Sequence, residues 1–214
     1  MRAIAINGSP RKDWNTAILL DNALKGAESG GSETELVHLY DLDYKGCVSC
    51  FKCKRKGGKN YAKCASEDEL TPILEKIEKA DILIMGAPIY MGSISGEMKS
   101  FLERLLFQYH IYAFPSRTSY EGNIKVGFIY DMGMNKERFD SALLKYHTES
   151  NDAIIRRIFG NLETVYCFDT YQMDDYTGIE YGIDIEKKRE RRKSEFPKDC
   201  EKAFEMGRKL VSGK

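Results

Sequence analysis

The sequence predicts an α/β fold in which a doubly wound parallel sheet carries helices on both faces. Short apolar runs such as AIAI and DILIMGAPIY alternate with longer segments whose apolar residues recur every three or four positions. This alternation is typical of β–α–β units. Runs that are apolar throughout predict strands buried on both faces, as in a parallel sheet.

Five strands and five helical segments follow one another along the chain. The strands are predicted at residues 3–6, 34–39, 81–90, 124–130 and 163–169, and the helices at 15–30, 66–79, 96–109, 136–159 and 184–214. A capping box, Ser66-x-x-Glu69, is expected to open the second helix, and Pro197 interrupts the last. Right-handed crossovers between five strands favour the flavodoxin-like order 2-1-3-4-5.

Composition limits the class of protein. We expect residues 1–214 to form a single domain, with a cysteine-containing insertion at about 41–65 and a charged helical extension at about 184–214. The 33 basic residues balance the 33 acidic ones, which argues against a general nucleic-acid or membrane-surface binder. The start of the chain lacks the pattern of a signal peptide, so we expect a cytoplasmic protein with reduced thiols.

The stretch NGSPRKDWNT, residues 7–16, joins the first strand to the first helix. In a doubly wound sheet, ligands bind beyond the carboxyl ends of the strands where the strand order reverses. Free N–H groups at a helix start favour an anion there. We expect the side chains of Ser9, Arg11, Asn15 and Thr16 to bind a phosphate group. The alternative is an ordinary loop in which Asn15 or Thr16 caps the helix.

A second loop, GAPIYMGSISGEMK at residues 86–99, follows the third strand on the other side of the same switch point. Pro88 and Gly92 shape a loop that can lie close to a flat ligand, and Tyr90 offers an aromatic face. The N–H groups of Met91, Gly92 and Ser93 can reach ring nitrogens and carbonyls. The alternative is a generic loop with a core-facing tyrosine.

A third loop, YDMGMN at residues 130–135, follows the fourth strand. By topology it approaches the same ligand from the remaining side, and we expect Asp131, Met132 and Gly133 to contribute. Met132 and Met134 serve equally well as fillers of the core.

The first two loops together resemble the NADPH-dependent FMN reductase and iron–sulfur flavoprotein family, whose fold is flavodoxin-like. The motifs are GSPR…NT and APIYMGSISGEMKSFLERL, and the resemblance runs from residue 1 to about 169. It implies that the first loop holds the FMN phosphate and that the second wraps the isoalloxazine ring. The residues implied are Ser9, Arg11, Asn15, Thr16, Pro88, Ile89, Tyr90, Met91, Gly92 and Ser93.

The resemblance also implies a homodimer or homotetramer with the flavin near a subunit interface. The aromatic stretch at residues 109–120 is a candidate for that interface or for a lid over the flavin, or is a surface connection. Trp14 stands where family members often carry glycine. It packs over the flavin or a neighbouring subunit, or it covers the loop.

Four cysteines follow the pattern C-x2-C-x2-C-x10-C: Cys47, Cys50, Cys53 and Cys64. The first three resemble the ligands of a bacterial [4Fe–4S] cluster, although the last gap is longer than in the iron–sulfur flavoproteins. Zinc bound by four thiolates is an alternative, and four free thiols are another. Cys167 and Cys200 are expected to have no part in the chemistry.

We therefore expect an FMN-binding oxidoreductase, with NADH or NADPH as the donor and a quinone, nitro compound, flavin or protein as the acceptor. The flavin carries the chemistry, so no catalytic side chain is expected. The first alternative is an electron carrier in which a [4Fe–4S] cluster passes electrons between a ferredoxin-like partner and FMN. The second is a zinc-stabilised binding module without flavin. No nucleic-acid or membrane partner is expected.

Overall fold

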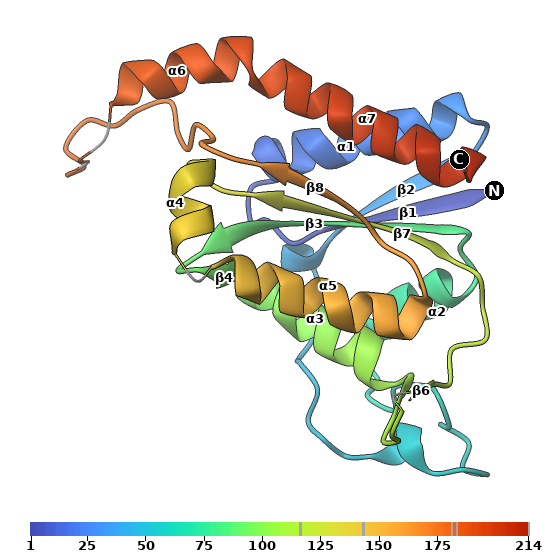
Figure 1. Cartoon of the computed structure of the whole chain (residues 1–214). Coiled ribbons are helices and arrows are strands. Elements are labelled where there is room, and N and C mark those ends of the chain that lie inside the picture. Colours follow the sequence, from blue (N-terminus) through green and yellow to red (C-terminus); the bar gives the residue numbers. More distant parts are fainter. Residues whose placement is uncertain (116, 143, 181, 183, 214) are drawn as a thin grey trace.

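The fold is built on one parallel sheet, drawn in Figure 1 from a computed structural model that describes residues 1–115, 117–142, 144–180, 182 and 184–213. Parts of the predicted segments 109–120, 136–159 and 184–214 lie outside the described residues. The main strands are β1 (Arg2–Asn7), β2 (Glu33–His38), β3 (Ile82–Tyr90), β7 (Lys125–Asp131) and β8 (Glu163–Cys167). They lie side by side in the order β2-β1-β3-β7-β8 and pair in parallel. The predicted flavodoxin-like order is confirmed.

Two helical layers cover the sheet (Figure 1). One face carries α1 (Asn15–Ser29) and α7 (Phe196–Ser212), and the other carries α2 (Thr71–Glu78), α3 (Gly96–Phe107) and α5 (Lys145–Phe159). Side chains of β1 alternate between two cores, as a strand requires. Ile4 and Ile6 enter the core beneath α2 and α3, whereas Ala3 and Ala5 leave room for α1 to lie close to the sheet.

The second helix begins later than the capping box predicts. α2 starts at Thr71, after a buried Leu70, with no side-chain cap. The acidic side chains of this turn are used elsewhere. Asp68 forms an ion pair with the buried Arg104 at 2.7 Å, and Glu69 accepts a hydrogen bond from the backbone of Asp43. The first contact attaches this turn to α3, and the second attaches it to the start of the cysteine segment. Neither side chain caps α2.

The long helix predicted at residues 136–159 is two helices, α4 (Lys136–Ser141) and α5. Phe139 and Ile155 are both buried. On one unbroken helix, residues this far apart would point roughly 160° away from each other. The break lets both side chains face the core, and Asn135 caps α4 by accepting from the Arg138 N–H at 2.9 Å.

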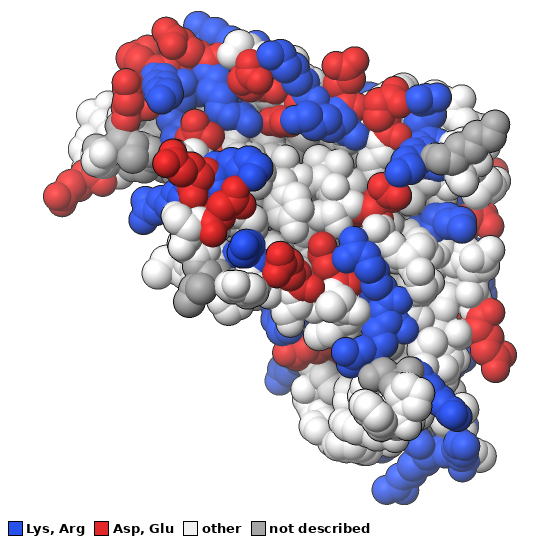
Figure 2. Space-filling view, viewed as in Figure 1, with Lys and Arg blue, Asp and Glu red and all other residues white. Residues whose placement is uncertain are grey.

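The charged C-terminal segment forms α6 (Ile185–Ser194) and α7, which begins with Pro197 in its first turn. α7 belongs to the body of the fold. Phe196, Ala203, Met206 and Leu210 are buried in the core shared with α1 and the sheet. Its remaining faces are charged, and Figure 2 shows acidic and basic side chains mixed along α6 and α7.

Shorter elements complete the chain. β4 (Ser93–Ile94) folds back on β3 as a hairpin, and β5 (His110–Ile111) pairs with β6 (Arg117–Thr118). The cysteine segment projects beneath α3 in Figure 1. One 3-10 turn, Leu39–Asp41, precedes this segment, and a second, Lys52–Lys54, lies within it. No described helix has the length and apolar character needed to cross a membrane.

Candidate functional site

The loop after β1 fixes the first side of the site. The N–H of Gly8 donates to the carbonyl of Gly86 at 2.8 Å, which brings the loop against β3. A Cβ at Gly8 would come within 2.8 Å of a side chain on α3, so only glycine fits. The N–H of Ser9 donates to Asn7 Oδ1 at 2.9 Å, and the N–H of Arg11 donates to Ser9 Oγ at 3.1 Å. The Ser9 hydroxyl thus accepts from the backbone, and its own proton is within reach of the Tyr90 oxygen at the cavity.

The start of α1 forms the floor beside this loop. Residue Trp14 is the N-cap, and its side chain does not cap the helix. The first N–H groups of a helix have no partner within it, and together with the helix dipole they favour an anion. Asn15 and Thr16 lie at this point and are almost fully buried. The alternative in which one of them caps the helix is therefore wrong.

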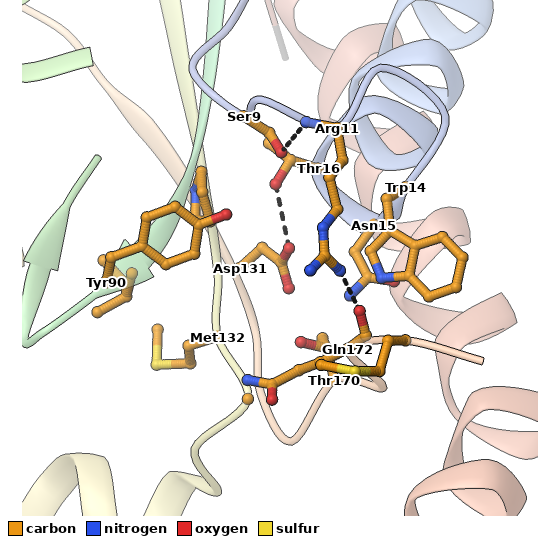
Figure 3. A pocket seen from close by; sticks show the side chains of 14 residues that line it. Ser9, Arg11, Trp14, Asn15, Thr16, Tyr90, Asp131, Met132, Thr170 and Gln172 are labelled. Atoms are coloured by element: carbon orange, nitrogen blue, oxygen red, sulfur yellow. Dashed lines mark hydrogen bonds between the residues drawn. The ribbon is translucent and has the colours of Figure 1, made fainter. Parts of the chain in front are cut away.

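These groups border an open cavity of about 210 Å³, shown in Figure 3. It lies at the carboxyl ends of β1, β3 and β7, with Tyr90 on one side and Trp14 on the other. Most of the residues expected at the ligand meet here. They are Ser9, Arg11, Asn15, Thr16, Pro88, Ile89, Tyr90, Asp131, Met132 and Gly133.

Three expected residues lie beyond the cavity wall. Met91 and Gly92 form the turn of the β3–β4 hairpin, both with positive φ, and Ser93 pairs back with Tyr90. Positive φ at both turn residues is typical of a two-residue hairpin. The Met91 side chain is fully exposed. Likewise, no described residue of 109–120 lines the cavity. Tyr109 and Tyr120 pack on Phe159 instead.

The segment after β8 supplies lining residues that the sequence did not predict: Thr170, Gln172 and Met173. Arg11 donates to the carbonyl of Gln172, and Asn15 Nδ2 donates to the carbonyl of Tyr171 at 2.9 Å. No motif marks these residues. Their position directly after the fifth strand was the available signal, because the carboxyl ends of all parallel strands meet at one edge.

Trp14 lines the cavity. Its Nε1–H donates to the Tyr171 carbonyl at 3.1 Å. The guanidinium of Arg192, on α6, lies 5.4 Å from the Trp14 ring centroid and donates to Asn15 Oδ1. α6 is thus attached to the first loop through a cation and an aromatic ring.

One buried acid faces the cavity. Asp131 ends β7, and its Oδ2 accepts from the Thr16 hydroxyl at 3.0 Å. Burial disfavours the charged carboxylate and raises the pKa of Asp131 to about 6. Hydrogen bonding from threonine hydroxyls and the charges of Arg192 and Arg191 act in the opposite direction and offset part of this shift.

The family of the chain follows from its sequence. Residues 1–130 match the family described as NADPH-dependent FMN reductase. The chain belongs to this family. The match ends at the strand that carries Tyr130, so it includes the first two loops of the site. The resemblance of the two loops to this family is therefore confirmed. The family consists of FMN-dependent oxidoreductases.

Individual relatives agree with this placement. An iron–sulfur flavoprotein of Methanocaldococcus jannaschii is 33% identical over 136 residues, which is 64% of each chain. The aligned part is thus less than two thirds of that relative. An NAD(P)H:quinone oxidoreductase from Methanothermobacter marburgensis has the same fold, with a TM-score of 0.71, 17% identity and 98% of both chains covered. An FMN-dependent NADH-azoreductase from Bacillus anthracis, solved with FMN, gives a TM-score of 0.62 at 12% identity, covering 100% of this chain and 99% of that one.

The four clustered cysteines lie together at some distance along the chain from the loops of this cavity in this member of the FMN reductase family. Cys47, Cys50, Cys53 and Cys64 border one small cavity beneath α3, of about 20 Å³. Arg104 enters the same cavity, and its Nε–H donates to Cys64 Sγ at 2.9 Å. Among the described residues, no group of three or more His, Cys, Asp or Glu side chains is arranged to hold a single metal ion.

The backbone of this cysteine segment is unusual. Ser49, Phe51 and Ala62 have positive φ, a region that residues other than glycine seldom adopt. Such conformations cluster at functional sites. The two remaining cysteines lie elsewhere, as expected. Cys167 is buried in β8 with its thiol 3.1 Å from Asp199 Oδ2, and Cys200 lies on α7.

Proposed function

We propose that the chain binds FMN in the cavity between β1, β3 and β7 and acts as an NAD(P)H-dependent oxidoreductase with a quinone, nitro compound, flavin or protein as the acceptor. The observation that carries this proposal is the convergence of Ser9, Arg11 and Thr16 on the uncapped start of α1. Hydroxyl donors, an arginine and free helix N–H groups are the recognition set of a phosphate. The family supplies the class of cofactor.

The residues present fit FMN in two parts. The cavity of about 210 Å³ is smaller than the pockets of roughly 300–1,000 Å³ that enclose most ligands. It suits the phosphate and the chain that leads from it. The ring would then lie at the rim, along Pro88, Ile89 and the aromatic face of Tyr90. Bound FMN would supply hydride acceptance from NAD(P)H and onward electron transfer.

The chain's own part is to bind and orient. Ser9 and Arg11 would hold the phosphate, since both line the same cavity. Tyr90 and Met91 extend the apolar surface of the rim, and Met91 is fully exposed. An exposed methionine beside a cofactor site supports a homodimer or homotetramer in which a second subunit covers the ring.

Affinity for FMN tests the phosphate assignment. We expect Ser9→Ala and Arg11→Gln each to weaken FMN binding about tenfold or more in titration calorimetry, because each removes a bond to a charged group. Riboflavin, which lacks the phosphate, should bind the wild type weakly and be insensitive to both substitutions. Arg208→Gln, on the outer face of α7, is the matched control. Equal FMN and riboflavin affinities would contradict the assignment.

A second proposal is that this protein carries a [4Fe–4S] cluster and passes electrons between a ferredoxin-like partner and FMN. The supporting observation is that the four thiols of the C-x2-C-x2-C-x10-C pattern border one cavity. The spacing of the first three cysteines resembles the ligand run of a bacterial [4Fe–4S] cluster, and relatives of the chain are named iron–sulfur flavoproteins. The cavity would have to widen, since about 20 Å³ holds little more than one water.

Metal analysis of protein purified without air tests this second proposal. We expect about four irons per chain and a broad absorption that dithionite bleaches. Cys50→Ser should lose the iron, whereas Cys200→Ser, on α7, should retain it. One zinc per chain, or no metal, would contradict the cluster and leave the FMN proposal standing.

A further inference from the structure

The hydrogen bond from Thr16 to Asp131 competes with phosphate binding at one side of the cavity. Thr16 Oγ1 lies 3.0 Å from Asp131 Oδ2, and both side chains are buried, with exposed fractions of 1% and 6% for the two residues. The other carboxylate oxygen, Oδ1, is buried without a normal hydrogen bond from any described residue, although Thr170 lies nearby. Figure 3 shows the carboxylate between Thr16, Arg11 and Tyr90.

A hydroxyl group carries only one proton. While Asp131 is ionised, the Thr16 proton is directed at the carboxylate, and the hydroxyl offers only lone pairs to a ligand. An ionised phosphate is also an acceptor. The charged carboxylate therefore takes the donor that the phosphate needs and adds a negative charge beside it.

We propose that Asp131 is a positioning residue that takes up a proton as the FMN phosphate binds. The proton comes from solvent and is held on Oδ2, so that the carboxyl group becomes the donor to Thr16 Oγ1. The Thr16 hydroxyl then turns and donates its own proton to a phosphate oxygen. No covalent bond changes apart from the transferred proton. This inference rests on the proposed FMN site.

The surroundings of Asp131 support this reversal. Burial already raises its pKa to about 6, and a nearby phosphate would raise it further. The charged and titratable groups around it come from the first loop and three further elements: Arg11 in the loop, Tyr90 on β3, Cys167 on β8, and Arg191 and Arg192 on α6. Arg11 donates to the Gln172 carbonyl, and the two arginines of α6 also have other partners. Arg191 pairs with Asp199 at 2.7 Å, and Arg192 donates to Asn15.

Calorimetric titration of the wild-type protein with FMN measures the proton directly. Between pH 7 and 8.5 the FMN phosphate is already a dianion in solution, so its own ionisation contributes little to the measured proton uptake. In buffers of different ionisation heat we expect uptake of about one proton per FMN. Over this range the dissociation constant should rise by up to about tenfold per pH unit.

Asp131→Asn is the matched variant, since its amide can donate to Thr16 at every pH. We expect it to bind FMN without proton uptake and with a dissociation constant that is flat above pH 7. Arg208→Gln, on the outer face of α7, is the control and should keep the proton uptake of the wild type. Tight binding to the wild type with no proton uptake, or an unchanged pH dependence in Asp131→Asn, overturns this inference alone. Absence of FMN binding at every pH overturns the proposed function as well.

Discussion

At the scale of single residues, the buried carboxylate of Asp131 works against the stability of the ligand-free fold. Folding raises its pKa to about 6 from about 4 in an unfolded chain. The penalty is therefore absent below about pH 4, grows as the pH rises to about 6 and is complete above it. A group held for a ligand at the expense of stability is typical of a binding site.

Replacing this acid should stabilise the protein without FMN. We expect Asp131→Asn to raise the free energy of unfolding by about 2–3 kcal/mol at pH 7.5. Urea unfolding at pH 7.5 and pH 4 measures the difference. The gain should fall to a small fraction of this at pH 4, where the wild-type carboxyl is protonated in the folded state and about half protonated in the unfolded one. An equal gain at both pH values would show that the charge is not its cause.

The residues of the first loop could be predicted because their chemistry and their position agree. Ser9, Arg11, Asn15 and Thr16 carry donors and follow a buried strand, and the structure brings them to one cavity. The bond from Thr16 to Asp131 could not be predicted. This bond depends on where the end of β7 lies relative to the start of α1. The sequence does not reveal the distance between these two points.

At the scale of elements, α1 and α7 pack with almost no space between their backbones. A Cβ added at Gly207 would lie 1.8 Å from the Ala23 carbonyl oxygen, and one at Gly26 would lie 2.0 Å from that of Phe204. Backbone atoms cannot yield as a flexible side chain does. These glycines therefore set the distance between the two helices, which lie side by side in Figure 1.

Gly207→Ala should force the helices apart. We expect it to lower the free energy of unfolding by about 2 kcal/mol or more, because overpacking a close contact costs more than alanine gains in helix propensity. Thermal unfolding followed by circular dichroism checks this. Gly182→Ala, at a position with no described atom within 4 Å, is the control and should unfold as the wild type does. Equal stability of both variants would contradict the packing argument.

Periodicity and apolar runs predicted the elements themselves well, because each strand and helix buries one continuous set of side chains. The errors occurred where a side chain had a distant partner. Ser66 and Glu69 match a capping box locally, yet Glu69 accepts from the backbone N–H of Asp43. The neighbouring Asp68 pairs with Arg104. The break between α4 and α5 likewise depends on the burial of both Phe139 and Ile155. The sequence near the break does not show that both side chains face the same core.

At the scale of the whole molecule, two candidate sites lie in different parts of one fold. The cavity at the switch point lies at the carboxyl edge of the sheet, whereas the four cysteines lie beneath α3. Figure 2 shows basic side chains at the lower tip of the molecule, where the cysteine segment lies in Figure 1. The topology predicted the first site, since doubly wound sheets bind ligands at this crevice. The second follows from cysteine spacing alone.

FMN binding at the switch-point cavity is the claim on which the account depends. The most direct measurement is a visible absorption spectrum of protein purified without air, recorded before and after FMN is added and the excess removed. The account predicts a retained flavin spectrum with two bands and about one FMN per chain at saturation. A protein that retains no flavin after addition of FMN would contradict it.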